Sequence, residues 1–148
     1  KFIMNSFRRT GKEISTEDAG LIVEKVKSHS WYVQQLSHFV WSATRKAVTV
    51  EIVDKAFSQI VNTNLPLYVA ECEALSITQL NLLIAIAKGE SVLTGATTMS
   101  KYKLGTPQNV SKNKIVLEQK DILDKTVEGF YFLDPVFEFW FKSEYVDG

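Results

Sequence analysis

The chain has 148 residues, and 45% of them are apolar, which is enough for the packed core of one domain or of two small ones. Seventeen basic and seventeen acidic side chains cancel, so the net charge excludes attraction of the whole molecule to nucleic acid or membrane, and any such affinity must be local. The one cysteine, Cys72, cannot form an internal disulfide, which favours a reducing cytoplasm and a buried thiol without a catalytic role.

The longest apolar runs, such as LLIAIA at residues 82–87, are too short to span a bilayer, and no signal peptide precedes the first predicted helix. We therefore expect a soluble, cytoplasmic protein with no membrane partner. The chain starts without an initiator Met, within a helical pattern, and we expect it to be part of a longer protein.

Apolar spacing near 3.6 residues predicts helices up to about residue 120. The first, FIMNSFRR, ends at Gly11. The second begins with Ser15 and Asp18 at the spacing of a capping box, and its apolar residues form one buried stripe.

The third predicted helix, WYVQQLSHFVWSAT, has a broad apolar face, and Ser28 or Ser30 can cap its start. The fourth starts at Thr49 and ends near Asn64. These helices form a four-helix unit over residues 1–64.

Asn64 to Pro66 is the one plausible hinge, because proline disfavours helix in the residue before it. A second domain is predicted over residues 65–148, and the charge changes sign between the two parts of the chain. Residues 1–62 hold nine basic and six acidic groups, whereas residues 63–148 hold eight and eleven. In the second domain Ser76 caps a helix that stops at Gly89, and a short helix follows near residues 96–103.

The segment YKLGTPQNVSKNKIV, residues 102–116, carries clear signals for the start of a helix. Gly105 supplies a tight turn, Thr106 is a good N-cap, and Pro107 suits the first helical position. A helix-turn-helix is therefore predicted, with an exposed second helix over residues 107–120. Two strand-like runs follow, separated by a two-residue turn at Glu128 and Gly129, so the order is that of a winged helix. The predicted fold class is mainly α.

Helical geometry predicts which side chains of this second helix face outward if Val110 and Leu117 face the core. Gln108, Lys112, Ile115 and Gln119 then point to solvent, with Asn109 and Ser111 on the flanks. Amides and lysine suit groove reading, and residues 101–120 hold five lysines and one acid, which favours phosphate contact. Ile115 does not fit a polar groove unless a thymine methyl lies near. The candidate DNA-binding residues are Lys101, Lys103, Thr106, Gln108, Asn109, Ser111 and Lys112.

The hairpin argues against DNA. Residues 121–148 hold seven acidic and two basic groups, and Asp121, Asp124 and Glu128 would be repelled by phosphates. The alternative is a protein-interaction or autoinhibitory module that uses Ile115, Trp31 or the acidic hairpin. The composition leaves both functions open.

Other features are interpreted as structural. His29 and His38 are too far apart for a helical metal pair, so we expect no metal site, and no catalytic nucleophile or acid pair is present. The aromatic run FYFLDPVFEFWF is expected in the core, with Pro135 starting the last helix. Trp31 and Trp41 are expected to be buried against neighbouring helices.

Five segments, in order, resemble the C-terminal part of the archaeal-type ATPases, which are AAA+/STAND-related proteins: HSWYVQQLSHFVW, VTVEIVDKAF, LSITQLNLLIAIA, LGTPQNVSKNKIVLEQKDILD and YFLDPVFEFWFK. The resemblance covers nearly the whole chain. It implies that residues 1–64 are a helical lid and residues 65–148 a winged helix. It also implies a partner N-terminal P-loop domain that binds ATP and Mg²⁺ in the full-length parent.

The chain itself lacks the motifs of ATP hydrolysis. RRTGKEIS has Glu13 where a P-loop needs Ser or Thr, and no paired acids for magnesium follow a strand, so this fragment is not expected to be an enzyme or to hold a cofactor. The related ATPases usually carry an Arg or a Gly-x-Pro turn at the start of the third helix of the lid, and this chain has neither at that position. Since a helix N-terminus presents N–H groups to anions, the residues expected nearest the nucleotide are Ser28, His29, Ser30 and Trp31.

Overall fold

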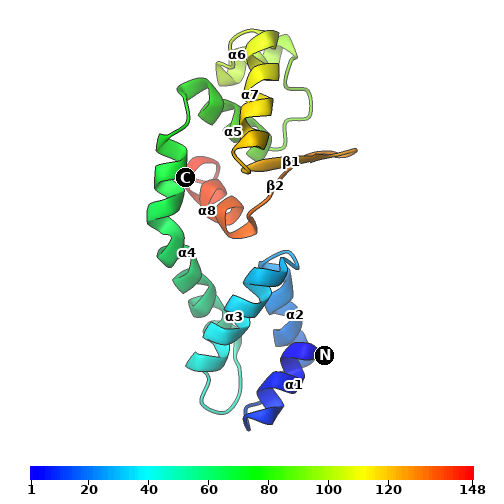
Figure 1. Ribbon diagram of the computed structural model, residues 1–148, viewed down its shortest axis with the longest axis vertical. Coiled ribbons are helices and arrows are strands. Elements are labelled where there is room, and N and C mark those ends of the chain that lie inside the picture. The colour runs from blue at the N-terminus through cyan, green and yellow to red at the C-terminus, as the bar shows by residue number, and fades with distance from the viewer. The chain divides into compact units, whose positions relative to one another are not determined.

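The computed structural model describes residues 1–148 and is mainly helical, with one small antiparallel sheet (Figure 1). This confirms the predicted fold class. The chain divides into two compact units, Lys1–Asn64 and Leu65–Gly148. None of the helices combines the length and the apolar character needed to cross a membrane. The elements are α1 (Phe2–Arg9), α2 (Thr16–Lys25), α3 (Ser30–Ala43), α4 (Val50–Glu73), α5 (Ile77–Ala87), α6 (Ala96–Tyr102), α7 (Pro107–Gln119), β1 (Leu123–Thr126), β2 (Gly129–Phe132) and α8 (Pro135–Tyr145).

The first unit packs the apolar stripes of its helices into one core. Ser15 caps α2 by accepting the backbone N–H of Asp18 at 2.9 Å, as the capping-box spacing predicts. Ile22 of α2, Leu36 of α3 and Ile60 of α4 are all fully buried. A short backbone pairing that the sequence did not indicate joins residues 13 and 47 in parallel.

The start of α3 differs from the prediction. Neither Ser28 nor Ser30 is the N-cap; that position is His29, whose side chain makes no capping hydrogen bond. An N-cap needs extended backbone, which His29 has at φ −65° and ψ 111°. Ser28 is left-handed at φ 61°, as is Lys27 at φ 49°, because the chain reverses direction there, and Ser30 already lies within the helix.

The predicted hinge at Asn64 to Pro66 is also wrong as a helix boundary. Helix α4 continues through Pro66 to Glu73 instead of ending near Asn64. Proline has no N–H and its ring crowds the carbonyl four residues earlier, so one hydrogen bond of the ladder is missing. The helix tolerates this loss because α4 has buried side chains on both sides of the proline, among them Ile60 before it and Tyr68 after it.

After the end of α4 the second unit contains α5, α6 and α7, and the last two form the helix-turn-helix. Ser76 starts α5 with a complete capping box, in which Gln79 bonds back to the backbone of Ser76. Leu82 and Leu83 of α5, and Leu117 of α7, are fully buried, and α5 packs on both α6 and α7. These helices lie where the capping and glycine signals predict.

An aromatic core supports the end of the unit. Asp134 caps α8 by accepting the backbone N–H of Val136 at 2.8 Å, and Pro135 is the first helical residue. The rings of Phe132, Phe137, Trp140 and Phe141 pack together, and Tyr68 joins them with its ring centroid 5.3 Å from that of Phe137. The prediction that this run forms core is therefore confirmed for these rings and wrong for Tyr131 and Phe139, which are 43% and 53% exposed.

The strands β1 and β2 pair antiparallel, from Leu123 opposite Phe132 to Thr126 opposite Gly129, and we call this hairpin the wing. Its turn differs from the prediction by one residue, because Gly129 belongs to β2 and the turn residues are Val127 and Glu128. The Thr126 hydroxyl explains the shift. It accepts the N–H of Glu128 and donates to the carbonyl of Gly129, both at 3.2 Å, and so closes the turn.

Replacement of Pro66 with alanine should stabilise α4, because alanine restores the missing N–H and removes the ring. Proline in a helix interior costs about 3 kcal/mol, and because α4 has already adapted to it, we expect a gain of about 1–2 kcal/mol. Urea unfolding followed by circular dichroism measures this change. The control is Val69→Ala, at a 39% exposed position of the same helix, where we expect a change within about 0.5 kcal/mol. A destabilised Pro66→Ala variant would show that the chain needs the proline.

Candidate nucleic-acid interface

The start of α7 is fixed by three adjacent residues. Thr106 is the N-cap and accepts the backbone N–H of Asn109 at 3.2 Å, and Pro107 occupies the first turn, as predicted. Gly105 has φ 82°, and a Cβ added there would lie 2.6 Å from Nδ2 of Asn109. The turn therefore needs glycine, and it sets the direction in which α7 leaves α6.

One stripe of α7 is buried and the opposite stripe is exposed. Val110, Asn113 and Leu117 are buried at 1%, 7% and 0% exposure, and Asn113 donates from Nδ2 to the Thr78 hydroxyl of α5 at 3.4 Å. The exposed residues are Gln108, Asn109, Ser111, Lys112, Ile115 and Gln119. This confirms the predicted orientation of α7, including the exposure of Ile115.

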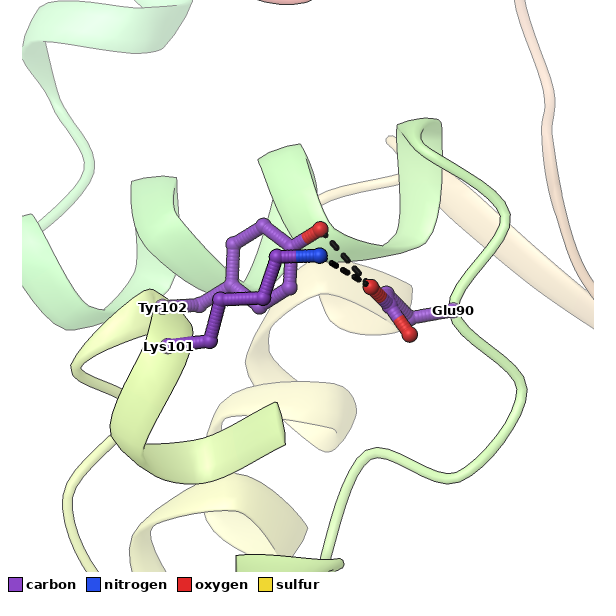
Figure 2. Close-up of polar contacts among 3 residues, drawn as sticks. All are labelled: Glu90, Lys101 and Tyr102. Atoms are coloured by element: carbon purple, nitrogen blue, oxygen red, sulfur yellow. Dashed lines mark hydrogen bonds and ion pairs between the residues drawn. The ribbon is translucent and has the colours of Figure 1, made fainter. Parts of the chain in front are cut away.

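The lysines near the turn have different surroundings. Lys103, at the left-handed C-cap of α6, is exposed. Lys101 forms an ion pair with Glu90, whose Oε1 also accepts a hydrogen bond from the hydroxyl of Tyr102 (Figure 2). The distances are 3.0 Å from Lys101 Nζ and 2.8 Å from the tyrosine oxygen. These hydrogen bonds lower the pKa of Glu90 and raise that of Lys101, so both groups are charged at neutral pH.

Lys125 and Asp124 lie on opposite faces of the wing. On one face Lys125 of β1 and Lys114 of α7 both approach the ring of Phe130, with Nζ 5.9 Å and 5.8 Å from its centroid. On the other face Asp124 accepts a hydrogen bond from the hydroxyl of Tyr131 at 3.3 Å. Asp124 therefore lies on the face of the hairpin away from Lys125, which separates this acid from the α7 side.

A surface hollow of about 400 Å³ lies between the wing and the helices. Lys114 and Lys125 line it together with Glu90 and Glu128, so its charges are mixed. At the tip of the wing Val127 is fully exposed, and the extended hairpin projects from the end of α7 in Figure 1. The tip of the wing thus combines an apolar residue, Val127, with an acidic one, Glu128.

The residues predicted to face a nucleotide lie together at the turn between α2 and α3. Ser28, His29, Ser30 and Trp31 are all exposed. Trp31 is 66% exposed, so the prediction that it is buried is wrong; it lies outside the buried stripe of α3, which is formed by Tyr32, Leu36 and Val40. Trp41 is partly buried and donates from Nε1 to the Thr10 hydroxyl at 2.8 Å.

Neither Lys12 nor Cys72 has the surroundings of a reactive group. Lys12 donates to the carbonyl of Trp41 at 2.6 Å and lies over its ring, 4.0 Å from the centroid. Burial raises the pKa of Cys72 to about 11, so the thiol is protonated at neutral pH and is a poor nucleophile. No three His, Cys, Asp or Glu side chains gather closely enough to hold a metal ion.

Sequence reasoning missed the partners of Lys101. Glu90 and Tyr102 are separated by 12 positions, and no periodic pattern connects the loop after α5 with the end of α6. The acidic count of the last 28 residues also gave no indication that Asp124 and Lys125 lie on opposite faces of the wing. Alternation along β1 was the available signal, since successive side chains of a strand point to opposite faces.

A comparison with protein-family models matches residues 66–143 to the family described as "Probable winged helix domain", which is more than half of the chain. The matched segment contains α5, α6, α7, the wing and most of α8. The comparisons with curated proteins and with solved structures found no match.

Gly105→Ala should distort the turn before α7. A left-handed conformation costs a residue with a Cβ about 1–2 kcal/mol, and the added methyl must also displace the amide of Asn109. We expect a loss of stability of that size, measured by urea unfolding. Gly20→Ala is the matched control, because Gly20 lies within α2 with open space at its Cβ position, and it should stabilise by about 0.5–1 kcal/mol. Equal effects of the two substitutions would contradict the role given to Gly105.

Proposed function

The chain belongs to the family described as probable winged helix domains, and from this we propose that its second unit binds duplex DNA through the exposed face of α7. The observation that carries the proposal is the amphipathic placement of α7. Its apolar stripe is covered by α5, and its amide, hydroxyl and lysine side chains face solvent next to the turn.

An α-helix fits the major groove of B-DNA, and polar side chains near the start of a recognition helix reach base edges there. Gln108 and Asn109 each offer one donor and one acceptor group, which suits adenine. Lys112, one turn after Gln108, can reach a guanine edge or a phosphate. Ile115, 54% exposed, lies one turn further along the same face and would contact the methyl group of a thymine.

Phosphate contacts would supply most of the affinity. Because the net charge of the chain is zero, these contacts must come from lysines gathered locally at the interface. Lys103 and Lys112 are exposed near the turn, and Lys114 and Lys125 lie on the α7 side of the wing. The acid Asp124 faces away from them and is bonded to Tyr131. The position of Asp124 supports an approach of DNA on the α7 side of the wing, where Glu90 and Glu128 partly offset the charge of the lysines.

We further propose that the first unit, residues 1–64, is the helical lid of an ATPase parent and that a P-loop domain of that parent binds ATP and Mg²⁺. Support comes from the order of the five resembling segments and from the exposure of Ser28, His29, Ser30 and Trp31 at the start of α3. Trp31 provides the test. In a longer chain that carries a P-loop domain, ATP should change the fluorescence of Trp31, and a Trp31→Phe variant should abolish that change. An unchanged spectrum at saturating ATP would contradict the assignment.

A protein partner is the second candidate, and the tip of the wing favours it. Val127 is a fully exposed apolar residue next to Glu128, an unsuitable pair for contact with phosphates. A basic partner with an apolar pocket would suit this tip. Val127→Ser should then weaken binding to that partner and leave the affinity for DNA unchanged.

The affinity of the full chain for a labelled duplex should be measurable by fluorescence anisotropy at about 50 mM salt and should fall as salt rises. Lys112→Ala should weaken binding and reduce the slope of log K against log salt by about 0.9, because one phosphate contact is lost. Gln108→Ala should weaken binding without changing the slope if its contact is to a base.

Lys55→Ala is the matched control, since it removes one positive charge from an exposed position of α4 in the first unit. Its affinity and salt slope should equal those of the parent chain. Absence of binding at about 50 mM salt would refute the proposed function, and equal effects of Lys55→Ala and Lys112→Ala would show that α7 is not the binding face.

A further inference from the structure

Two hydrogen-bond donors at the end of α6 converge on a single carboxylate oxygen. Lys101 Nζ and the Tyr102 hydroxyl lie 3.0 Å and 2.8 Å from Oε1 of Glu90 (Figure 2). The ammonium group also lies 4.9 Å from the centroid of the Tyr102 ring, so the two side chains run side by side. We call them the Lys101–Tyr102 pair.

The geometry of this pair suits an anionic oxygen. One donor is charged and one is neutral, and charge-assisted hydrogen bonds of this kind are those that lysine and tyrosine make to phosphate oxygens of DNA. The pair lies on the last turn of α6, directly before the turn that leads into α7. A phosphate bound there would belong to the same DNA backbone that flanks the groove occupied by α7.

We propose that Glu90 occupies a phosphate-binding site formed by the Lys101–Tyr102 pair, and that a backbone phosphate of duplex DNA takes the place of the carboxylate on binding. The proposal rests on the proposed DNA-binding function and adds to it a specific contact and a competing group. Tyr102 becomes a contact residue, and Glu90 becomes a residue that limits affinity.

Exchange of the carboxylate for a phosphate is physically reasonable at this position. The side chains of Lys101 and Glu90 are 61% and 29% exposed, and an ion pair so open to solvent contributes little stability. The displaced carboxylate can be solvated, because the Glu90 side chain is partly exposed and borders an open surface hollow.

The test compares variants of the full chain by anisotropy with one labelled duplex over a range of salt concentrations. Lys101→Met should lower the affinity about threefold or more and reduce the salt slope by about 0.9, since a phosphate contact is lost. Tyr102→Phe should lower the affinity and leave the slope unchanged, because it removes a neutral donor. Thermal unfolding by circular dichroism checks that each variant is folded.

Glu90→Gln should raise the affinity, and a double-mutant cycle separates competition from the general effect of removing an acid. The gain should be larger than that of Glu118→Gln, which removes an acid from α7. The gain in affinity from Glu90→Gln should be smaller when Lys101→Met is also present, because Glu90 then has no Lys101 ammonium group to pair with. Equal gains in the presence and absence of Lys101 would overturn the proposal.

The outcomes also separate this inference from the function on which it rests. If Lys101→Met binds DNA with the affinity and salt slope of the parent while Lys112→Ala binds more weakly, the Lys101–Tyr102 pair is not a phosphate site and the α7 interface stands. If the parent chain does not bind duplex DNA at all, both proposals are refuted.

Discussion

Burial of one stripe of α7 against α5 is the constraint on which the proposed interface depends. Val110, Asn113 and Leu117 recur at helical spacing, and their burial leaves the opposite stripe in solvent. The hydrogen bond from Asn113 to Thr78 ties that buried stripe to the first turn of α5. Rotation of α7 about its axis would bury lysine and amide side chains, so the packing of α5 decides which residues a partner meets.

The remainder of the second unit holds this arrangement in place. The wing extends from the end of α7, and Phe132 of β2 packs on Phe137 and Phe141 of α8. Tyr68, from the second half of α4, completes the aromatic core and donates to Asp134 at 3.2 Å. The aromatic side chains that a sequence pattern could assign to base stacking thus have a supporting role, and the candidate contacts are small polar and basic side chains.

The features that were predicted correctly are those encoded by local chemistry. Ser15, Ser76 and Thr106 each cap the helix that follows them, and Gly105 supplies its turn, because these signals depend on residues within a few positions. The exposed face of α7 followed from helical geometry alone. The features that were predicted wrongly depend on a balance between opposing free-energy contributions, to which residues outside the local sequence contribute. Helix α4 passes Pro66 because buried residues on both sides outweigh one lost hydrogen bond.

The positions and partners of the charged side chains were harder to predict than the helices and strands. Counting acids and bases by segment treated the wing as uniformly acidic, yet its two faces differ. Lys101 counted as a free cation, although a carboxylate 11 residues earlier holds it. Such pairings depend on tertiary contacts between a loop and a helix, so no periodicity reveals them. The local charge that a ligand meets therefore depends on the tertiary structure.

We propose that DNA contacts the α6–α7 side of the second unit. Backbone amide chemical shifts of the isotopically labelled full chain, recorded during titration with a duplex, test it most directly. The account predicts that the largest changes fall on residues 101–115, with small changes in residues 1–64. Changes concentrated in the first unit or on α8, with the α7 amides unaffected, would contradict it.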